Sequence, residues 1–301
     1  MEKLLIICGA TASGKTKLAI DCAKKLNTEI ISADSQLIYR NLDIGTAKPT
    51  IEEMDGVVHH MIDVVEPQCN FSVSDYCRLA EPIINRLFSE KKVPIICGGT
   101  GFYINSLIYD LSYGNTGADS AIRDKYNSVL EERGKEYLYN MLLNVDPQTA
   151  KVLHVNDTKR VIRALEIYEA SGTKKSEIAD KKIPKYNYTA IAIDYPREEL
   201  YDRINRRVDA MFDAGLVEEI ENLVNSGLTQ ENQCMQAIGY KEVLECLKNG
   251  DNDSTMRDII KLNTRHYAKR QITFFKKIEG IVWLKPAEAT QEKVLELFNG
   301  H

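Results

Sequence analysis

Apolar runs alternate with amphipathic stretches over the first third of the chain. Leu4–Cys8 is a short, fully apolar run, and Glu29–Ala33 and Val93–Cys97 are predicted as two further strands. Between them, Lys15–Leu26 repeats its apolar residues at helical spacing, and Val73–Ser89 is amphipathic. Short apolar runs joined by helices are typical of parallel strands buried between helical layers. The pattern predicts an α/β fold, a parallel doubly wound sheet flanked by helices, with ligands at the carboxyl ends of its strands.

The pattern changes between residues 113 and 186, where apolar strand runs are absent. Helices are predicted over 119–133, 134–144 and 158–171, the last of them capped after Asp157 and stopped at Gly172. Strand character returns at Thr189–Asp194 and at Ile281–Leu284, with a helix starting from Arg197 between them. We therefore expect a discontinuous α/β core domain, residues 1–112 and 187–301, with an inserted all-helical domain at 113–186.

Composition limits the class of protein. The 301 residues include 39 basic and 44 acidic side chains, a net charge of −5, and 44% are hydrophobic, as in an ordinary globular protein. The acidic excess argues against coating nucleic acid by bulk charge. It leaves room for a local basic groove, because phosphate contacts act over about a Debye length, ~10 Å.

Cysteine usage and hydropathy indicate the compartment. The seven cysteines include no Cys-x-x-Cys pair, and no stretch approaches the ~20 apolar residues of a membrane span. We expect a cytoplasmic monomer without structural zinc and without membrane attachment.

The first candidate for chemistry is a complete G-x-x-x-x-G-K-T motif between the first strand and the first helix. Its backbone N–H groups and the helix N-terminus form an anion nest, its lysine reaches the outer phosphate, and its last hydroxyl can ligate Mg²⁺. The alternative is a chance glycine turn. The motif predicts a P-loop that binds a diphosphate or nucleotide through Gly9, Ala10, Thr11, Ala12, Ser13, Gly14, Lys15 and Thr16, with Thr16 as the metal ligand.

Two further strand ends carry polar residues that we expect near this loop. Asp34 follows the second strand, where a carboxylate can act as a base or a Mg²⁺ ligand, although helix N-capping is an equal alternative for a lone aspartate. Thr100 follows the third strand within Gly98–Gly101, where the backbone can approach a ligand closely. Asp194 is left out of the site, because Pro196 after it makes a strand-to-turn role equally good.

Basic residues on the predicted helices are candidates for anion binding. Arg203 and Arg207 share one helix face and can clamp a leaving diphosphate, although solvated helix arginines are the commoner explanation. Residues 257–277 mix seven basic side chains with aromatic ones, as a surface for single-stranded RNA does. The alternative there is a solvated helix face.

Several blocks, taken together, resemble the tRNA dimethylallyltransferase (tRNA isopentenyltransferase) family. The Asp-Ile-Gly-Thr-Ala-Lys-Pro and Tyr-Ala-Lys-Arg-Gln blocks are more specific to it than the phosphate loop. The family's eukaryotic members carry a C-terminal zinc finger that this sequence lacks, so the expected type is bacterial. The matching blocks are Gly9–Thr16, Ser32–Tyr39, Asp43–Pro49, Gly98–Thr100, Asn156–Glu166, Ile238–Tyr240 and Thr264–Gln271.

The resemblance implies a tRNA-modifying enzyme and supplies roles for individual residues. The family transfers a dimethylallyl group from dimethylallyl diphosphate to N6 of the adenosine 3′ of the anticodon, in tRNAs that read codons beginning with U. It implies Asp34 as general base, with Thr100 and Arg123 beside the reacting adenine. The implied contacts to the tRNA anticodon stem-loop are Asp34, Ser35, Gln36, Leu37, Lys159, Arg160, Val161, Ile162, Arg163, Gln236, Ala237, Ile238, Gly239, Tyr240 and Lys241. From the basic helix we add Lys269 and Arg270.

The chemistry of the residues agrees with this transfer. A carboxylate assists a weakly nucleophilic amine, and the P-loop with Mg²⁺ stabilises the departing diphosphate. The alternative is a small-molecule kinase that binds ATP at the same loop, followed by a P-loop ATPase or switch. A GTPase is disfavoured, because no Asn-Lys-x-Asp element occurs.

Overall fold

The computed structural model describes residues 2–109, 119–178 and 183–300. It divides the chain into two compact units, Met1–Ile108 with Pro184–His301, called here the core unit, and Tyr109–Ile183, called the helical unit. The insertion expected at 113–186 has similar bounds, and residue 113 itself lies outside the described residues. Each unit contains its own hydrophobic cluster and is described by itself.

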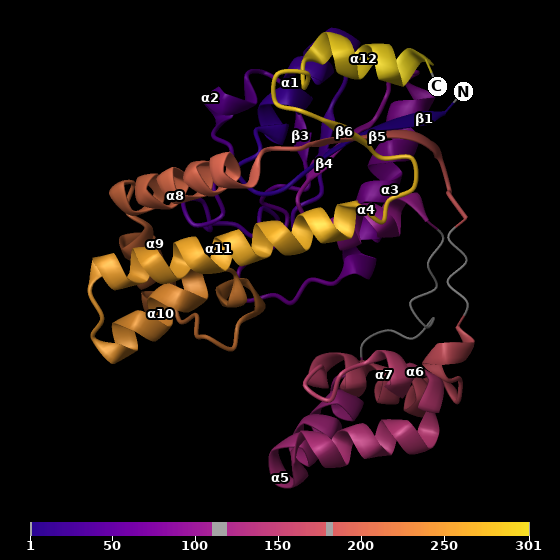
Figure 1. Cartoon of the computed structure of the whole chain (residues 1–301), viewed down its shortest axis with the longest axis vertical. Helices are drawn as coiled ribbons and strands as arrows, with labels where there is room; N and C mark the ends of the chain where they lie inside the picture. Colours follow the sequence, from indigo (N-terminus) through magenta and orange to yellow (C-terminus); the bar gives the residue numbers. More distant parts are fainter. Residues whose placement is uncertain (1, 110–118, 179–182, 301) are drawn as a thin grey trace. The chain divides into compact units, whose positions relative to one another are not determined.

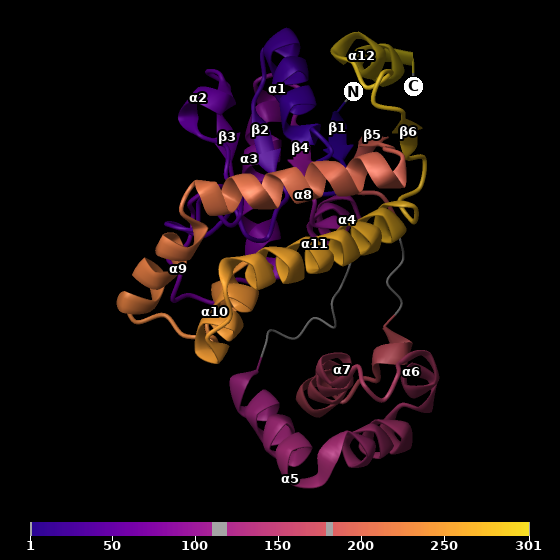
Figure 2. The same cartoon turned by 60° about the vertical axis from the view of Figure 1, so that its left-hand side comes forward.

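A six-stranded parallel sheet organises the described part of the core unit (Figure 1). Its strand order is β3-β2-β4-β1-β5-β6, from left to right in Figure 2. Its strands are β1 (Lys3–Cys8), β2 (Ile30–Ser32), β3 (His59–His60), β4 (Ile95–Gly98), β5 (Asn187–Ile193) and β6 (Val282–Leu284). β1 pairs with β4 on one side and β5 on the other, and Leu4–Cys8 are completely buried. The fully apolar run is explained by burial of both strand faces.

Helices cover this sheet. α1 (Lys15–Leu26) and α12 (Gln291–Gly300) pack on one face through Leu18, Val294 and Phe298. α8 (Arg197–Asp213) and α11 (Asp253–Phe275) run side by side in both views (Figures 1 and 2). The remaining described elements of the unit are α2 (Ile51–Met54), α3 (Val73–Ser89), α4 (Gly101–Ile108), α9 (Leu216–Asn225), the short 3-10 helix η2 (Gln233–Gln236) and α10 (Tyr240–Asn249).

The helical unit consists of α5 (Ser120–Val145), α6 (Pro147–Val152), α7 (Thr158–Ser171) and the 3-10 helix η1 (Lys175–Glu177). Leu138 and Leu142 of α5 pack against Val161 and Leu165 of α7. α5 is interrupted at Gly134, whose φ of 80° and ψ of 170° are not helical. This interruption explains why the hydrophobic pattern divides the segment into 119–133 and 134–144.

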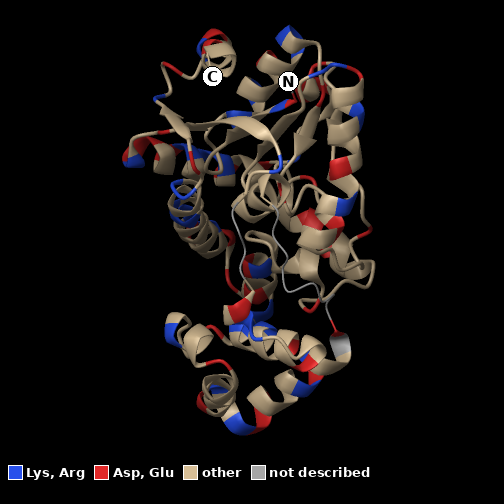
Figure 3. Cartoon of the chain, turned by 90° about the vertical axis from the view of Figure 1, so that its right-hand side faces the viewer, with Lys and Arg blue, Asp and Glu red and all other residues tan. Residues whose placement is uncertain are grey.

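The predicted parallel sheet flanked by helices is confirmed, with differences of a few residues at strand ends. The helices α9 and α10 were not predicted, and neither were β3, α2, α4 and α6, whose few residues carry no readable periodicity. Acidic and basic residues are interspersed over both units (Figure 3). Within the described residues, none of the helices is both long enough and apolar enough to cross a membrane.

Candidate active site at the carboxyl ends of the strands

Three loops meet where β1, β2 and β4 end. In the sheet register, Cys8 lies opposite Gly98, and Ser32 opposite Cys97, so the loops that follow begin at one edge. Two backbone hydrogen bonds join the second and third loops: Ala33 N–H donates to the Cys97 carbonyl at 2.8 Å, and Thr100 N–H to the Ala33 carbonyl at 2.9 Å. The sheet therefore brings Asp34, Thr100 and the P-loop together, as carboxyl-end sites in parallel sheets are built.

The P-loop ends at a helix N-terminus prepared for an anion. Gly14 begins α1 in the left-handed region, at φ 82°, where a residue with a Cβ is strained. It supplies no side-chain cap, and the first turn of α1 contains no acidic residue. By contrast, α3 is capped by Ser72 and carries Asp75 in its first turn. The uncapped amides and the positive end of the helix dipole at α1 favour a phosphate ligand.

Two side chains of the loop face a partly dehydrated environment. Lys15 donates to the Ala10 carbonyl at 3.3 Å. Burial lowers the pKa of Lys15, while the negative charge of Asp34 raises it and the positive charge of Arg207 lowers it further. Ser13 is 1% exposed, and its hydroxyl has no hydrogen-bond partner among the described residues. A buried hydroxyl without a partner is costly, so it indicates a ligand that supplies one.

Arg203 and Arg207 of α8 both reach this space. The Arg203 Nε–H donates to the Ala12 carbonyl at 2.8 Å, and its guanidinium lies 4.8 Å from the centre of the Tyr195 ring. Burial lowers the pKa of Arg207, and the carboxylate of Asp34 opposes that shift. Arg203 therefore contacts the backbone of the P-loop, and Arg207 interacts electrostatically with Lys15 and Asp34.

Asp34 and Thr100 are held by short local contacts. One oxygen of Asp34 accepts the Gln36 N–H at 2.9 Å, and its other oxygen accepts no hydrogen bond from the described residues. Thr100 Oγ1 accepts the Ser35 N–H at 3.0 Å and donates to the Ser35 hydroxyl at 3.3 Å. The geometry leaves one carboxylate oxygen of Asp34 available to accept a proton.

The structure adds two residues that the sequence analysis did not single out, Tyr267 and Gln271 of α11. Gln271 accepts the Thr11 N–H at 2.9 Å and donates to the Gly99 carbonyl at 2.8 Å. Burial, and after it the negative charge of Asp34, raises the pKa of Tyr267. Their four-residue spacing within the Tyr-Ala-Lys-Arg-Gln block was the available signal, because it places both on one helix face.

The basic stretch on α11 divides into two groups. Arg257 and Lys261 form ion pairs with Asp209 of α8, and Arg265 donates to Asn205 at 3.0 Å. These three side chains therefore fasten α11 to α8. Lys269 and Arg270 are exposed, and the Arg270 guanidinium lies 5.7 Å from the centre of the Tyr267 ring.

The predicted tRNA segment Gln236–Lys241 surrounds a buried tyrosine. Tyr240 is completely buried, and its hydroxyl donates to Glu219 of α9 at 2.6 Å. The same carboxylate accepts the N–H groups of Asp43, Ile44 and Gly45 at 2.9, 2.7 and 3.1 Å. Gln236 is exposed, whereas Ala237 and Gly239 are buried and Ile238 and Lys241 are partly exposed. In this segment the side chain of Tyr240 supports the Asp43–Pro49 loop.

The remaining candidates lie in the helical unit. Lys159 and Arg160 are exposed on α7, but Val161 and Ile162 lie in the core of the unit. Any contact of this segment with RNA therefore has to come from its basic side chains. Arg123 of α5 and Arg163 both pair with Glu166, whose side chain is completely buried, at 2.9 and 3.0 Å.

The donor set near the P-loop fits a magnesium ion carried by phosphates. No group of three or more His, Cys, Asp or Glu side chains suited to a metal occurs among the described residues. Mg²⁺ is commonly held by one or two protein oxygens together with substrate phosphates and water, and Thr16 on the first turn of α1 offers such an oxygen.

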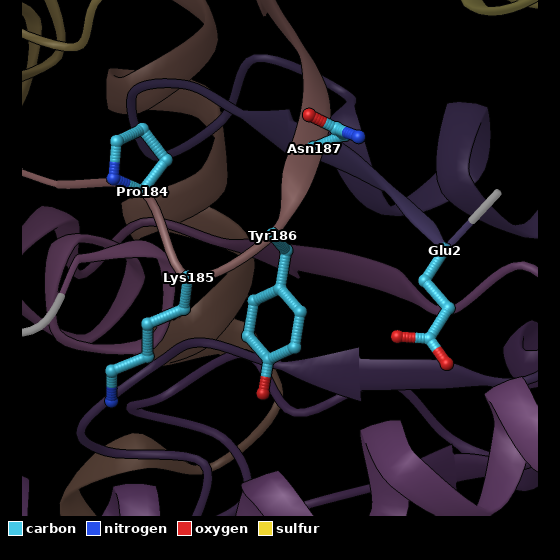
Figure 4. Close-up of a pocket in the computed structure, with 5 residues that line it drawn as sticks. All are labelled: Glu2, Pro184, Lys185, Tyr186 and Asn187. Atoms are coloured by element: carbon cyan, nitrogen blue, oxygen red, sulfur yellow. The ribbon is translucent and has the colours of Figure 1, made fainter.

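A separate pocket of about 530 Å³ lies away from these loops (Figure 4). Its lining residues Glu2, Lys185 and Tyr186 precede β1 and β5, so they lie at the opposite ends of the strands. It contains none of the residues discussed above.

Comparison with known proteins places the chain in a family. A tRNA dimethylallyltransferase from Acetivibrio thermocellus is 47% identical over 302 residues, covering 98% of this chain and 96% of that protein. The structure of a full-length tRNA isopentenylpyrophosphate transferase from Bacillus halodurans is 40% identical, with a TM-score of 0.73, over 100% of this chain and 95% of that one.

A crystal structure of a eukaryotic dimethylallyltransferase acting on tRNA is 31% identical, with a TM-score of 0.81, over 96% of this chain and 74% of that one. The family model for IPP transferase matches residues 37–278. This match covers most of the chain, including Thr100, both arginines of α8 and the whole of α11. The chain belongs to the IPP transferase family.

Proposed function

We propose that this enzyme transfers a dimethylallyl group from dimethylallyl diphosphate to N6 of the adenosine 3′ of the anticodon, in tRNAs reading codons that begin with U. One observation carries the proposal: the Asp34 carboxylate lies beside Gly99, and the Gln271 amide joins Gly99 to Thr11 of the P-loop, so the carboxylate and the anion-binding loop adjoin. Transfer of an alkyl group from a diphosphate to an amine needs a base beside the amine and cations beside the diphosphate, and the two have to lie close together. The relatives favour this transfer over the ATP-dependent kinase.

The electrophile is held on the P-loop side. The backbone N–H groups at the start of α1, with Lys15, Arg203 and Arg207, bind the diphosphate and stabilise the charge that grows as the carbon–oxygen bond breaks. Thr16 would hold a Mg²⁺ ion there, which when bound would supply further positive charge beside the leaving diphosphate. The diphosphate departs with the bonding electron pair.

The nucleophile is held on the Asp34 side. As the N6–carbon bond forms, the free oxygen of Asp34 accepts a proton from the amine. The hydroxyl of Thr100, which accepts the N–H of Ser35, orients the Asp34 carboxylate. The adenine has to leave its stack to enter the site, which costs a few kcal/mol and least in a single-stranded loop. An anticodon loop meets that condition, and the exposed Lys269 and Arg270 hold its phosphates. We further propose that the enzyme is a cytoplasmic monomer.

Labelled dimethylallyl diphosphate, Mg²⁺ and an unmodified anticodon stem-loop test the proposal. We expect label in the RNA with one diphosphate released per label, and no label when the adenosine is replaced by inosine, which lacks the amine. Chelation of Mg²⁺ should slow the transfer. Label that stays out of the RNA, or phosphorylation of a small molecule with ATP, would overturn the proposal.

A further inference from the structure

Gln271 joins the two sides of the site through a single side chain. It lies on α11, is 5% exposed, and accepts the Thr11 N–H of the P-loop at 2.9 Å. Its amide nitrogen donates to the carbonyl of Gly99, at 2.8 Å, one residue before Thr100. A buried amide with partners on both its oxygen and its nitrogen is fixed in orientation, because rotation would leave each partner unpaired.

The fit around this amide is close. A Cβ added to Gly99 would lie 2.4 Å from the Gln271 nitrogen and 3.7 Å from a carboxylate oxygen of Asp34. The absence of a side chain at Gly99 therefore lets Gln271 reach the backbone beside Asp34. The amide also occupies the N–H of Thr11, so this group of the P-loop is committed to α11.

We infer that Gln271 is a positioning residue that sets the spacing between the leaving group and the nucleophile, an inference that rests on the proposed transfer. The P-loop holds the diphosphate, and the loop of Gly99 and Thr100 carries the groups beside the amine. Both loops are tied to one amide, so the distance over which the new bond forms is fixed by α11. A displacement of about 1 Å between reacting groups costs up to about 100-fold in rate.

Two replacements separate the contacts of the amide. Gln271→Glu keeps an acceptor for Thr11 N–H but places an oxygen against the Gly99 carbonyl. Gln271→Met keeps the length and removes both polar contacts. Gly99→Ala keeps the Gln271 side chain but forces it to move, because the added Cβ would lie 2.4 Å from its amide nitrogen. Thr273→Ala, on the exposed side of the same helix, is the control.

Single-turnover transfer, with the anticodon stem-loop and dimethylallyl diphosphate both saturating, distinguishes positioning from folding. We expect Gln271→Met and Gln271→Glu to lower the rate constant about 10- to 100-fold, with an unchanged amplitude and an RNA Kd within about threefold of wild type. Gly99→Ala should slow transfer in the same direction, and Thr273→Ala should match wild type. A folding defect would instead lower the amplitude and leave the rate constant unchanged.

Three outcomes contradict the inference. The rate constant of both Gln271 variants stays within about twofold of wild type, or it recovers fully once dimethylallyl diphosphate is raised, or only the amplitude falls. If the wild-type enzyme transfers no label at all, the proposed function is overturned, and this inference with it. That result differs from the other three outcomes, in which the wild-type enzyme is active.

Discussion

Asp34 faces two competing demands at the end of β2. Its negative charge opposes the lowering of the pKa values of Lys15 and Arg207 by burial. As a base, it has to give up that charge in the transition state. Diphosphate departure generates negative charge nearby at the same moment, so the cations keep a partner throughout the reaction.

Replacing Asp34 by Asn therefore tests chemistry more than binding. We expect the single-turnover rate constant to fall by ~10²–10⁴, the usual contribution of a general base, with little change in the RNA Kd. Asp194→Asn is the matched control, since it alters an acid directly after strand β5 of the same sheet, and its rate constant should stay within about threefold of wild type. Weaker RNA binding at an unchanged rate constant would make Asp34 a contact for RNA alone.

α11 carries different tasks along and around its length. Its first half is fastened to α8 by Arg257 and Lys261. Its second half directs Gln271 inward to the P-loop and exposes Lys269 and Arg270. One rigid helix thus connects an exposed basic surface with the buried site.

The salt dependence of RNA binding separates these groups of basic side chains. Lys269→Ala with Arg270→Ala should reduce the slope of log K against log [salt] by about 0.7–0.9 for each phosphate that is no longer neutralised, because fewer counterions are released. The rate constant at saturating RNA should barely change. Arg257→Ala should leave the slope unchanged, because that cation is paired with Asp209 and Asp213. Equal slopes of log K against log [salt] for wild type and the double variant would exclude this surface from RNA binding.

At the scale of the whole molecule, each unit has its own hydrophobic cluster among the described residues. Asp146 of the helical unit is 1% exposed and accepts hydrogen bonds from the Thr149 N–H and hydroxyl and from the Ser176 N–H. Burial alone would raise the pKa of Asp146, but these hydrogen bonds outweigh it and lower the pKa to about 2. The single tryptophan, Trp283, lies in β6 of the core unit.

Asp146→Asn is expected to destabilise the helical unit by about 2 kcal/mol at pH 7. Because the pKa of Asp146 is lowered on folding, this contribution is present above the ordinary carboxyl range. It is lost as the pH falls toward 2, so the difference from wild type should shrink with acid. Circular dichroism, which reports both units, should show an earlier thermal transition in the variant. Trp283 fluorescence should not shift, and a common shift in both signals would mean that the units unfold together.

The sequence by itself determined the sheet, the P-loop and the family. Leu4–Cys8 and Gly9–Thr16 are local signals, since burial of a strand and a turn into a helix depend on neighbouring residues. The separation of a helical insertion could also be read from the loss of strand patterns.

Only the tertiary structure decided which side chains meet. Gln271 contacts Thr11 and Gly99 across 260 and 172 positions of sequence, a distance over which no periodicity carries information. Similarly, Arg257 and Lys269 are both basic residues of one helix, and only the packing against α8 distinguishes the paired cation from the exposed one. Local patterns fix what an element is, whereas the role of each of its faces depends on what the folded chain places against that face.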